Sequence, residues 1–237
     1  MIASGCVFNN YTDRRIDKQM ARTKKRATVT GKISGRSAVI YATLLGITGF
    51  AVLVEFVNLL TVAIGFGALF FYVVVYGFWK RRSTLGTVIG SIAGATPPAA
   101  GYCAVTNNID TGAAILFLIL VCWQMPHFYS IAVYRLRDYA AASLPVLPVK
   151  KGIHITKIYI VLYITAFIGA AQLLTIYGYT GYTYAVVLAI LGLAWLWKAI
   201  RGFNAPDYKR WARTMFLFSL IVITTLSSVI AANAVLP

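Results

Sequence analysis

The chain has 237 residues, of which 59% are hydrophobic and only 12% carry a charged side chain. A soluble globular domain averages about 45–50% apolar and about 25% charged residues, so this composition excludes that class, and it also excludes a disordered chain. The net charge is +16, but the basic residues form no single face or arm of the kind that binds nucleic acid, and we expect no nucleic-acid partner.

Seven apolar segments are long enough to cross a lipid bilayer as helices, because about 20 helical residues cover a hydrocarbon core of about 30 Å. Residues 1–8 are also apolar but too short to cross, and they resemble the end of a further, truncated span. The sequence therefore predicts an all-α, polytopic membrane helix bundle that forms a single domain over residues 1–237. In chain order the seven predicted spans are residues 37–58, 61–79, 85–104, 112–134, 157–177, 182–200 and 214–235.

The basic residues mark one end of these spans. All 22 Lys and Arg residues fall in four segments, and the intervening turns contain none; the segments are residues 14–36, 80–82, 135–157 and 198–213. By the positive-inside rule these loops are cytoplasmic and the C-terminus lies outside. We expect a multi-pass protein of the cytoplasmic (inner) membrane.

A polar stripe lies ahead of the first full span. Asn9, Asp13 and Asp17 are spaced by four residues, which places them on one face of a helix. Carboxylates at this spacing repel each other unless a cation lies between them, and hard oxygen ligands suit Mg²⁺. The basic residues of segment 22–26 could then bind phosphate oxygens. The alternative is that the carboxylates only pair with neighbouring basic residues at the membrane interface.

A second polar motif follows the fourth predicted span. Asp138 is flanked there by basic residues, and an interface ion pair is the alternative to a functional role. We expect Pro145 and Pro148 to end any helix and to fix an extended loop. Two prolines within residues 95–101 should likewise kink or unwind the third span.

His127 lies within the fourth predicted span, in the sequence W-Q-M-P-H. Its imidazole could ligate iron, move a proton or hydrogen-bond a substrate. The alternative is a buried histidine whose hydrogen bonds are satisfied by a neighbouring span. Glycines at 86, 90 and 94 form a small-residue series that predicts close helix packing.

Several motifs together resemble the UbiA-type intramembrane prenyltransferases, and more narrowly the branch of that family that farnesylates haem. The match runs from the first residues to the last span, with the motifs in matching order and spacing. The motifs are S-G-C-V-F-N-N-Y-x-D-R-x-I-D (4–17), G-T-x-I-G-S (86–91), P-P-x-x-G-Y-C-A-V-T (97–106), W-Q-M-P-H (123–127) and R-x-x-D-Y-x-A-A-x-x-P-V-L-P-V-x-K-G (135–152).

The resemblance implies a nine-span bundle around a cavity that opens to the cytoplasm. It implies transfer of a farnesyl group from farnesyl diphosphate to the 2-vinyl group of haem b, giving haem O. The implied metal is Mg²⁺, held by Asn9, Asp13 and Asp17. The implied diphosphate-binding residues are Asn9, Arg22, Lys24, Arg135, Arg137 and Tyr139, and the implied catalytic residues are Asp13, Asp17, Asp138 and His127, the last lining the porphyrin part of the cavity.

The family carries two spans that are not matched in full here. We therefore expect the reading frame to continue upstream of Met1, or the chain to be an inactive truncated form. Two other functions stay open: prenyl transfer to another aromatic acceptor such as a quinone precursor, and cation transport gated by the aspartates. The resemblance implies farnesyl diphosphate, haem b and the lipid bilayer as partners, and it leaves haem A synthase or assembly proteins of terminal oxidases as protein partners.

Overall fold

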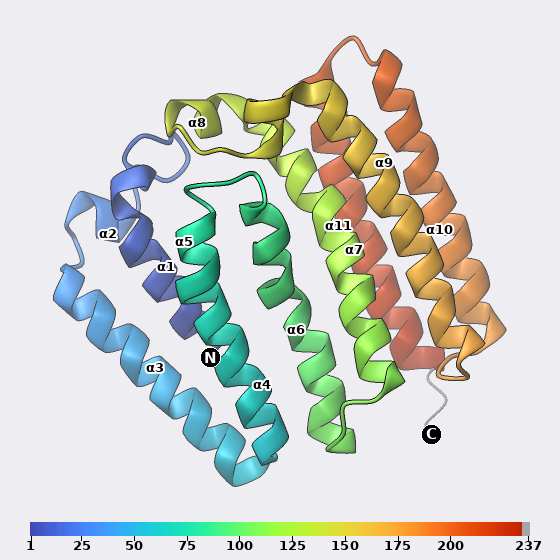
Figure 1. The fold of residues 1–237 in the computed structure, drawn as a ribbon, viewed down its shortest axis with the longest axis horizontal. Helices are drawn as coiled ribbons and strands as arrows, with labels where there is room; N and C mark the ends of the chain where they lie inside the picture. Colours follow the sequence, from blue (N-terminus) through green and yellow to red (C-terminus); the bar gives the residue numbers. More distant parts are fainter. Residues whose placement is uncertain (234–237) are drawn as a thin grey trace. The chain divides into compact units, whose positions relative to one another are not determined.

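The structure is a computed structural model, and it describes residues 1–233 (Figure 1). Its elements are helices, as the sequence predicts for a polytopic membrane protein. In chain order they are α1 (Ile2–Asp17), α2 (Ala27–Thr30), α3 (Gly35–Phe56), α4 (Leu59–Phe70), the π-helix η1 (Phe71–Tyr76), α5 (Gly77–Trp79), α6 (Gly86–Thr106), α7 (Thr111–Tyr134), α8 (Leu136–Ala141), α9 (Leu147–Ile176), α10 (Tyr182–Arg201), the 3₁₀-helix η2 (Gly202–Asn204) and α11 (Tyr208–Asn233).

Seven helical segments are long and apolar enough to span a membrane, which confirms the predicted number of full spans. Their limits are Gly35–Phe56, Leu59–Trp79, Gly86–Thr106, Thr111–Tyr134, Leu147–Ile176, Tyr182–Asn204 and Tyr208–Asn233. The largest difference from the prediction is at α9, which begins ten residues before the expected span 157–177. The final two residues of the expected span 214–235 lie outside the described residues.

Two expectations about prolines were wrong in part, although Pro145 does lie in the non-helical segment between α8 and α9. Helix α6 continues through Pro97 and Pro98 without unwinding, because each proline removes one backbone hydrogen bond and the bonds on either side still hold the helix. Pro148 does not end a helix but lies in the first turn of α9, where its missing N–H is not needed. Helix α9 is interrupted instead at Gly152, whose φ of 82° lies in the left-handed region that favours glycine.

The chain divides into two compact units. Unit 1 comprises residues 1–108 and 136–146, and unit 2 comprises residues 109–135 and the chain from residue 147 onward. Helix α8 therefore belongs to unit 1, although the helices before and after it belong to unit 2. A single domain over residues 1–237 stays a prediction.

In unit 1, helices α1 and α3 pack closely through small residues. Ala38 and Ala42 of α3 are buried, and the hydroxyl of Ser4 on α1 donates a hydrogen bond to the carbonyl oxygen of Ala42 at 2.7 Å. A Cβ atom at Gly46 would lie only 3.1 Å from the same hydroxyl. Small side chains let the two backbones approach, as is common between membrane helices.

Helices α4 and α6 are joined at one end by Asn58. Its side-chain oxygen caps α4 by accepting a hydrogen bond from the amide of Thr61 at 2.8 Å. Its amide nitrogen donates to the carbonyl oxygens of Cys103 and Ala104 at the end of α6, at 3.1 and 3.2 Å. One side chain thus caps α4 and also bonds two carbonyl oxygens near the end of α6, of which that of Cys103 accepts a second hydrogen bond from the amide of Asn107.

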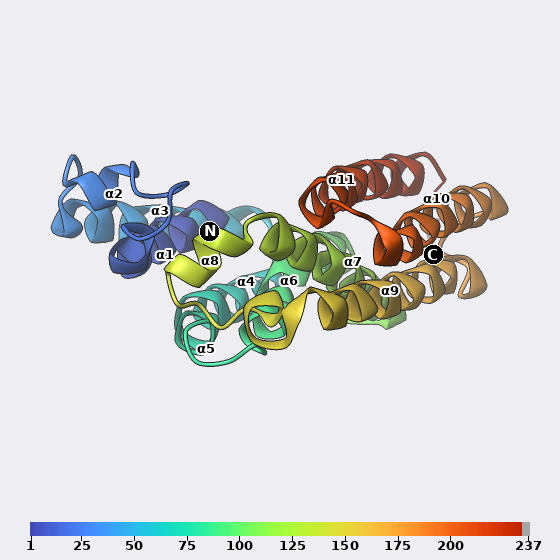
Figure 2. The same cartoon turned by 90° about the horizontal axis from the view of Figure 1, so that it is seen from above.

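In unit 2, α7 packs against α9 and α11, and α10 packs against the same two helices (Figure 2). Phe167 of α9 and Trp195 of α10 are fully buried between them. Their rings meet edge to face, with 5.8 Å between centroids and 81° between planes. This geometry is favourable for buried aromatic pairs.

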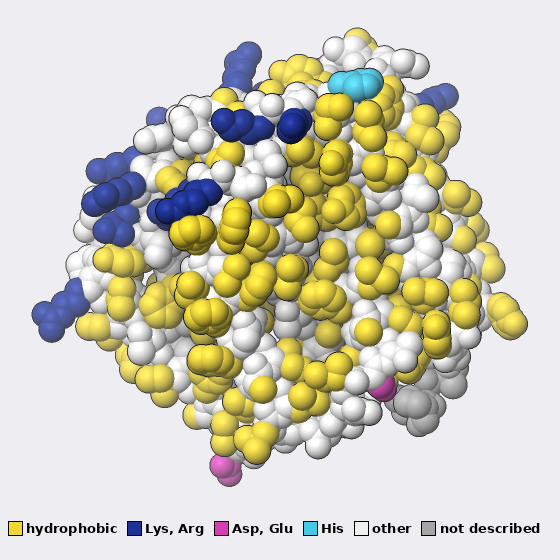
Figure 3. Space-filling view, viewed as in Figure 1, with side chains coloured by type: hydrophobic (Ala, Val, Ile, Leu, Met, Phe, Trp, Pro, Cys, Tyr) yellow, Lys and Arg dark blue, Asp and Glu magenta, His cyan; other side chains and the backbone are white. Residues whose placement is uncertain are grey.

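The flank of unit 1 is hydrophobic. Figure 3 shows Lys and Arg side chains gathered toward one end of this unit, with hydrophobic side chains over the rest of the visible face. On α3, Ile40, Leu44 and Ile47 share one helix face and are 50%, 57% and 61% exposed. Such a stripe is unfavourable in water and is typical of a helix in contact with lipid.

We expect Gly90→Ala to lower the free energy of unfolding by about 1–3 kcal/mol, because overpacking a close contact has that cost. The added Cβ would lie 2.8 Å from Cε2 of Tyr76. The matched control is Gly101→Ala on the same helix, where the added atom would meet no heavy atom within 4 Å. The control should unfold no more easily than the parent in a denaturant titration in mixed micelles, and equal losses in both variants would contradict the packing argument.

Candidate functional site

The predicted polar stripe lies on the final turns of α1. Asn9 and Asp13 are half-buried there, and Asp17, the last residue of the helix, is buried. The four-residue spacing therefore does place three oxygen-bearing side chains along one helix, at the end that carries the basic loops of unit 1.

Lys80 joins two of these side chains. It follows α5 directly, and its Nζ atom donates hydrogen bonds to Oδ1 of Asn9 and Oδ2 of Asp13, both at 2.5 Å. Arg81 donates to the other carboxylate oxygen of Asp13 and to the carbonyl oxygen of Thr12, both at 2.9 Å. The oxygens of Asn9 and Asp13 therefore converge on one cationic atom, while a second cation approaches Asp13 from the side.

The charge on Lys80 depends on this carboxylate. Burial lowers the pKa of Lys80 below its ordinary value, and the charge and hydrogen bond of Asp13 offset part of that effect by raising it. Arg81 lowers the pKa further because it is a like charge. Asp13 is thus the main group that favours the protonated form of Lys80.

Asp17 has a different partner. Its Oδ2 atom accepts a hydrogen bond from Nη1 of Arg26 at 2.8 Å, and its backbone oxygen accepts one from the hydroxyl of Thr23 at 3.1 Å. Both contacts fold the loop after α1 back onto the helix end. Arg22 and Lys24 lie on that loop with exposed side chains.

Two stacked tyrosines lie next to Lys80. Tyr72 and Tyr76 belong to the π-helix η1, and their rings stack with 5.5 Å between centroids and 17° between planes. The Nζ atom of Lys80 lies 5.1 Å from the ring centre of Tyr76. A π-helical turn inside an α-helix is uncommon and often marks a functional site. Two aromatic rings within the span therefore lie next to the oxygen cluster, by which we mean the side-chain oxygens of Asn9 and Asp13 around Lys80.

The second motif is divided between the units. Helix α8 of unit 1 carries Arg137, Asp138 and Tyr139, and Figures 1 and 2 place it at the end of unit 1 where α1 ends. Tyr139 is within electrostatic reach of Tyr76. Arg135 ends α7 in unit 2, where its guanidinium carbon lies 4.6 Å from the ring centre of Tyr134.

His127 lies in unit 2, on α7. Its Nδ1 atom is 2.7 Å from the hydroxyl oxygen of Ser219 on α11, and its ring stacks on Trp123 with 4.9 Å between centroids. The expected site residues thus fall into two groups. Unit 1 contains Asn9, Asp13, Asp17, Arg22, Lys24, Arg137, Asp138 and Tyr139, and unit 2 contains His127 and Arg135.

Sequence reasoning did not identify Lys80 and Arg81 as partners of the polar stripe, the first motif of the site. A signal was present, since the triplet Lys80, Arg81 and Arg82 belongs to the same alternating set of basic loops as the motif itself. Lys80 also follows Tyr76 by four residues, the spacing that places two side chains on one helix face.

The donor set at this site is mixed rather than purely acidic. Among the described residues, no group of three or more His, Cys, Asp and Glu side chains is arranged to hold a metal ion. The oxygens of Asn9 and Asp13 nevertheless surround one cationic position, which Lys80 occupies. Hard oxygen donors of this kind fit a divalent cation such as Mg²⁺.

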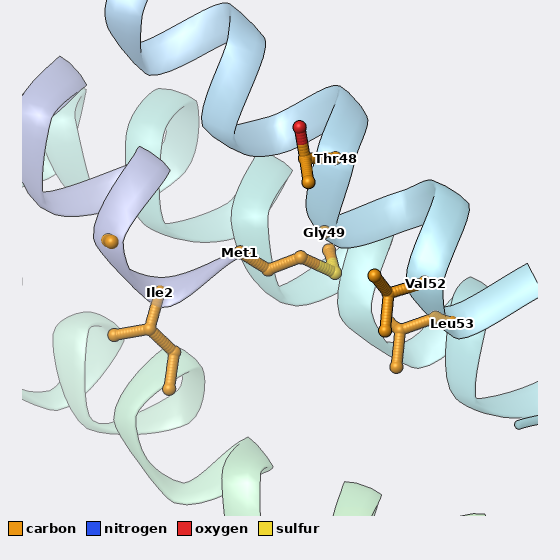
Figure 4. A pocket seen from close by; sticks show the side chains of 7 residues that line it. Met1, Ile2, Thr48, Gly49, Val52 and Leu53 are labelled. Carbon is orange, nitrogen blue, oxygen red and sulfur yellow. The ribbon is translucent and has the colours of Figure 1, made fainter. Parts of the chain in front are cut away.

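A hollow of about 490 Å³ lies at the other end of α1 (Figure 4). It contains none of the predicted site residues, and apart from Thr48 its lining is apolar or glycine. The lining residues are Met1, Ile2, Ala3, Thr48, Gly49, Val52 and Leu53. The hollow is therefore separate from the oxygen cluster near Asp13.

Comparison with known protein families gives a match to the UbiA prenyltransferase family over residues 1–221. Among similar proteins, the protoheme IX farnesyltransferase of Klebsiella pneumoniae is 50% identical over 238 aligned residues, covering 100% of this chain and 81% of the relative. The protein of the same name from Salmonella typhimurium is 51% identical, with 100% of this chain and 80% of the relative covered.

Two solved structures are also similar. One, of digeranylgeranylglyceryl phosphate synthase, has a TM-score of 0.78 and 18% identity, and the match covers 98% of this chain and 80% of that one. The other, a UbiA homolog from Aeropyrum pernix K1, has a TM-score of 0.73 and 17% identity, covering 97% and 84%. At this identity the likeness shows the fold, and it supports the predicted helical bundle.

We expect Asp13→Ala to lower the free energy of unfolding by about 3–5 kcal/mol at neutral pH, because it leaves a buried ammonium group without its carboxylate. Adding Lys80→Met should recover most of the loss. Raising the pH should also reduce the loss of stability in Asp13→Ala. The pKa of Lys80 is lowered in the folded state, so the folded chain releases this proton at a lower pH than the unfolded chain does, and the unpaired charge disappears.

The measurement is denaturant unfolding in mixed micelles without added metal. Glu55→Ala serves as the control, since Glu55 is an exposed carboxylate on α3. If Asp13→Ala unfolded like the control, or if the double variant were no more stable than Asp13→Ala, the ion pair would not have the assigned role.

Proposed function

We propose that this chain, which belongs to the UbiA prenyltransferase family, transfers a farnesyl group from farnesyl diphosphate to the 2-vinyl group of haem b, giving haem O. The observation that carries the proposal is the identity of half of all positions, along the whole chain, with protoheme IX farnesyltransferases. The convergence of Asn9, Asp13 and Lys80 supports it, because a diphosphate site needs both oxygen ligands and cations.

The reaction breaks the bond between C1 of the farnesyl chain and the diphosphate oxygen, and the electron pair leaves with the diphosphate. The π electrons of the vinyl group form the new bond to C1. A water oxygen then captures the cation on the haem side chain and loses a proton, which gives the hydroxyethylfarnesyl group. The protein has to hold the diphosphate, keep water from the farnesyl cation and orient the vinyl group.

Asn9 and Asp13 are the proposed ligands of Mg²⁺. Their oxygens fit because both already lie 2.5 Å from one cationic nitrogen. Asp17 is the proposed third ligand, and this role requires its carboxylate to exchange Arg26 for the metal. A bound Mg²⁺ supplies positive charge that stabilises the leaving diphosphate.

Basic side chains around this cluster bind the diphosphate oxygens. Lys80 and Arg81 already lie at the oxygen ligands, and when Mg²⁺ takes their place they are free to bind phosphate. Asp138 on α8 is the proposed catalytic residue of the second motif. The other proposed diphosphate ligands are Asn9, Arg22, Lys24, Arg135, Arg137 and Tyr139.

Tyr72 and Tyr76 protect the farnesyl cation in this proposal. Their stacked rings lie next to Lys80 and within a membrane span, where water is scarce. Aromatic faces stabilise a nearby cation by about 0.5–2 kcal/mol. The first carbon of the chain would therefore meet an aromatic surface as soon as its bond to diphosphate breaks.

The proposed location is the cytoplasmic (inner) membrane, with the basic loops and the diphosphate site on the cytoplasmic side and the C-terminus outside. The distribution of Lys and Arg along the sequence supports this orientation. Proposed protein partners are haem A synthase or assembly proteins of terminal oxidases, which would use the product.

Membranes that contain this chain should form haem O when incubated with haem b, farnesyl diphosphate and Mg²⁺. The product is identified by its mass and by incorporation of labelled farnesyl carbon. Parallel reactions with an aromatic acid of the quinone-precursor type as acceptor test the alternative activity. Labelled product from that acceptor alone would assign the chain to another branch of the family, and no product from either would indicate an inactive form.

We expect Asp13→Asn to lower the rate of haem O formation by about 10²-fold or more, since transition-state charge stabilisation by one group is typically of that size. Chelation of divalent metal should have the same effect in the parent and little further effect in the variant. Glu55→Gln, which changes an exposed carboxylate on α3, is the matched control and should keep the parent rate. A fully active Asp13→Asn variant would remove the metal assignment.

A further inference from the structure

A hydrogen-bond network in unit 2 connects α7 to one residue of α11. His127 and Trp123 lie one turn apart on α7, and both bind Ser219. The Nε1 atom of Trp123 donates to the backbone oxygen of Ser219 at 2.9 Å, and Nδ1 of His127 lies 2.7 Å from its hydroxyl oxygen. Ser219 is fully buried, so these contacts belong to the packed interior of the unit and not to its surface.

The position of the serine proton assigns the histidine tautomer. The hydroxyl of Ser219 lies 2.6 Å from the backbone oxygen of Phe216, and a carbonyl oxygen can only accept. Without a proton between them, two oxygens at that distance would repel each other. Ser219 therefore donates to Phe216, and its hydroxyl oxygen must accept the proton on Nδ1 of His127.

The same surroundings favour a neutral imidazole. The ring of His127 stacks on Trp123, and it also meets Phe128 and Phe216 at centroid distances of 5.6 and 5.0 Å. None of these contacts is acidic, and an unpaired charge among aromatic rings inside a membrane span is costly. With the proton on Nδ1, the Nε2 atom has a lone pair, and no hydrogen bond to Nε2 is present within residues 1–233.

We propose that Ser219 is a positioning residue that holds His127 in the Nδ1–H tautomer, so that Nε2 is available as a ligand to the iron of the haem substrate. Metal-binding histidines usually donate their other ring N–H to a fixed acceptor, and Ser219 is that acceptor here. Stacking on Trp123, which binds the same serine, limits rotation of the ring. The inference rests on the proposed function, because it takes haem b as the ligand.

The tautomer can be measured without any ligand. The chain has two histidines, so ¹⁵N chemical shifts of labelled protein, with His154→Gln to assign the signals, report directly on His127. We expect protonated Nδ1 and unprotonated Nε2 in the parent chain. A proton on Nε2, or on both nitrogens at neutral pH, would overturn the proposal.

Binding is tested with haem b and with metal-free protoporphyrin IX, followed by absorbance and, for the iron form, by electron paramagnetic resonance. His127→Ala should lose the histidine-ligated spectrum. Ser219→Ala should weaken haem b binding by about 10- to 100-fold, the usual effect of removing the group that orients a metal ligand. Binding of the metal-free porphyrin should change little, because its ring has no iron to ligate.

Two controls separate positioning from folding. Ser227→Ala removes an exposed serine on the same helix, whose hydroxyl bonds only within the helix, and it should bind both porphyrins like the parent. Ser219→Thr keeps the hydroxyl and should restore the spectrum lost in Ser219→Ala. Equal loss of both porphyrins in Ser219→Ala, or an unchanged haem spectrum, would contradict the positioning role.

The outcome is independent of the test of the proposed function. If the parent formed haem O but Ser219→Ala bound haem b normally, only this inference would fail. If the parent bound haem b through His127 but formed no haem O, the inference would stand and the proposed reaction would fail.

Discussion

A carboxylate at the edge of a hydrocarbon layer needs a positive charge beside it, and in unit 1 Lys80 provides that charge to Asp13 and also donates a hydrogen bond to Asn9. The two partners are 67 residues apart in the sequence, since Asp13 lies on α1 and Lys80 follows the second predicted span. Burial disfavours the ammonium charge of Lys80 and Asp13 favours it, so this charge depends on the carboxylate, while Asp13 is also paired with Arg81. The packing of α1 against its neighbours serves to hold this pair together.

The neighbouring tyrosines depend on the same arrangement. The π-helical turn carries Tyr72 and Tyr76 toward Lys80, and Gly90 on α6 leaves room for the Tyr76 ring. A larger residue at position 90 would move that ring, and with it the aromatic surface beside the cation. Small residues therefore do more here than allow helices to approach, because they leave space for the side chains of the site.

In unit 2 the polar side chains around His127 are satisfied by hydrogen bonds and not by an ion pair. Around His127 no acidic side chain of the described part of the chain is in contact: Trp123 donates to the backbone oxygen of Ser219, Ser219 donates to that of Phe216, and in the proposed tautomer His127 donates to the Ser219 hydroxyl. A neutral network has a lower desolvation cost than an ion pair, and it specifies which nitrogen has the proton. A charged site suits an anionic leaving group, and a neutral imidazole suits a metal-containing ring.

Local pattern in the sequence was enough for the helical class, the seven spans and the placement of Asn9, Asp13 and Asp17 along one helix, because span length and four-residue spacing follow from helix geometry alone. It was not enough for partners that are distant in sequence. Lys80 meets Asp13, Arg26 takes Asp17, and Ser219 meets His127, contacts that depend on which helices pack together and in which rotation. The prolines show the same limit: Pro97 and Pro98 stay inside α6 and Pro148 begins α9, since backbone context decides whether a missing N–H matters.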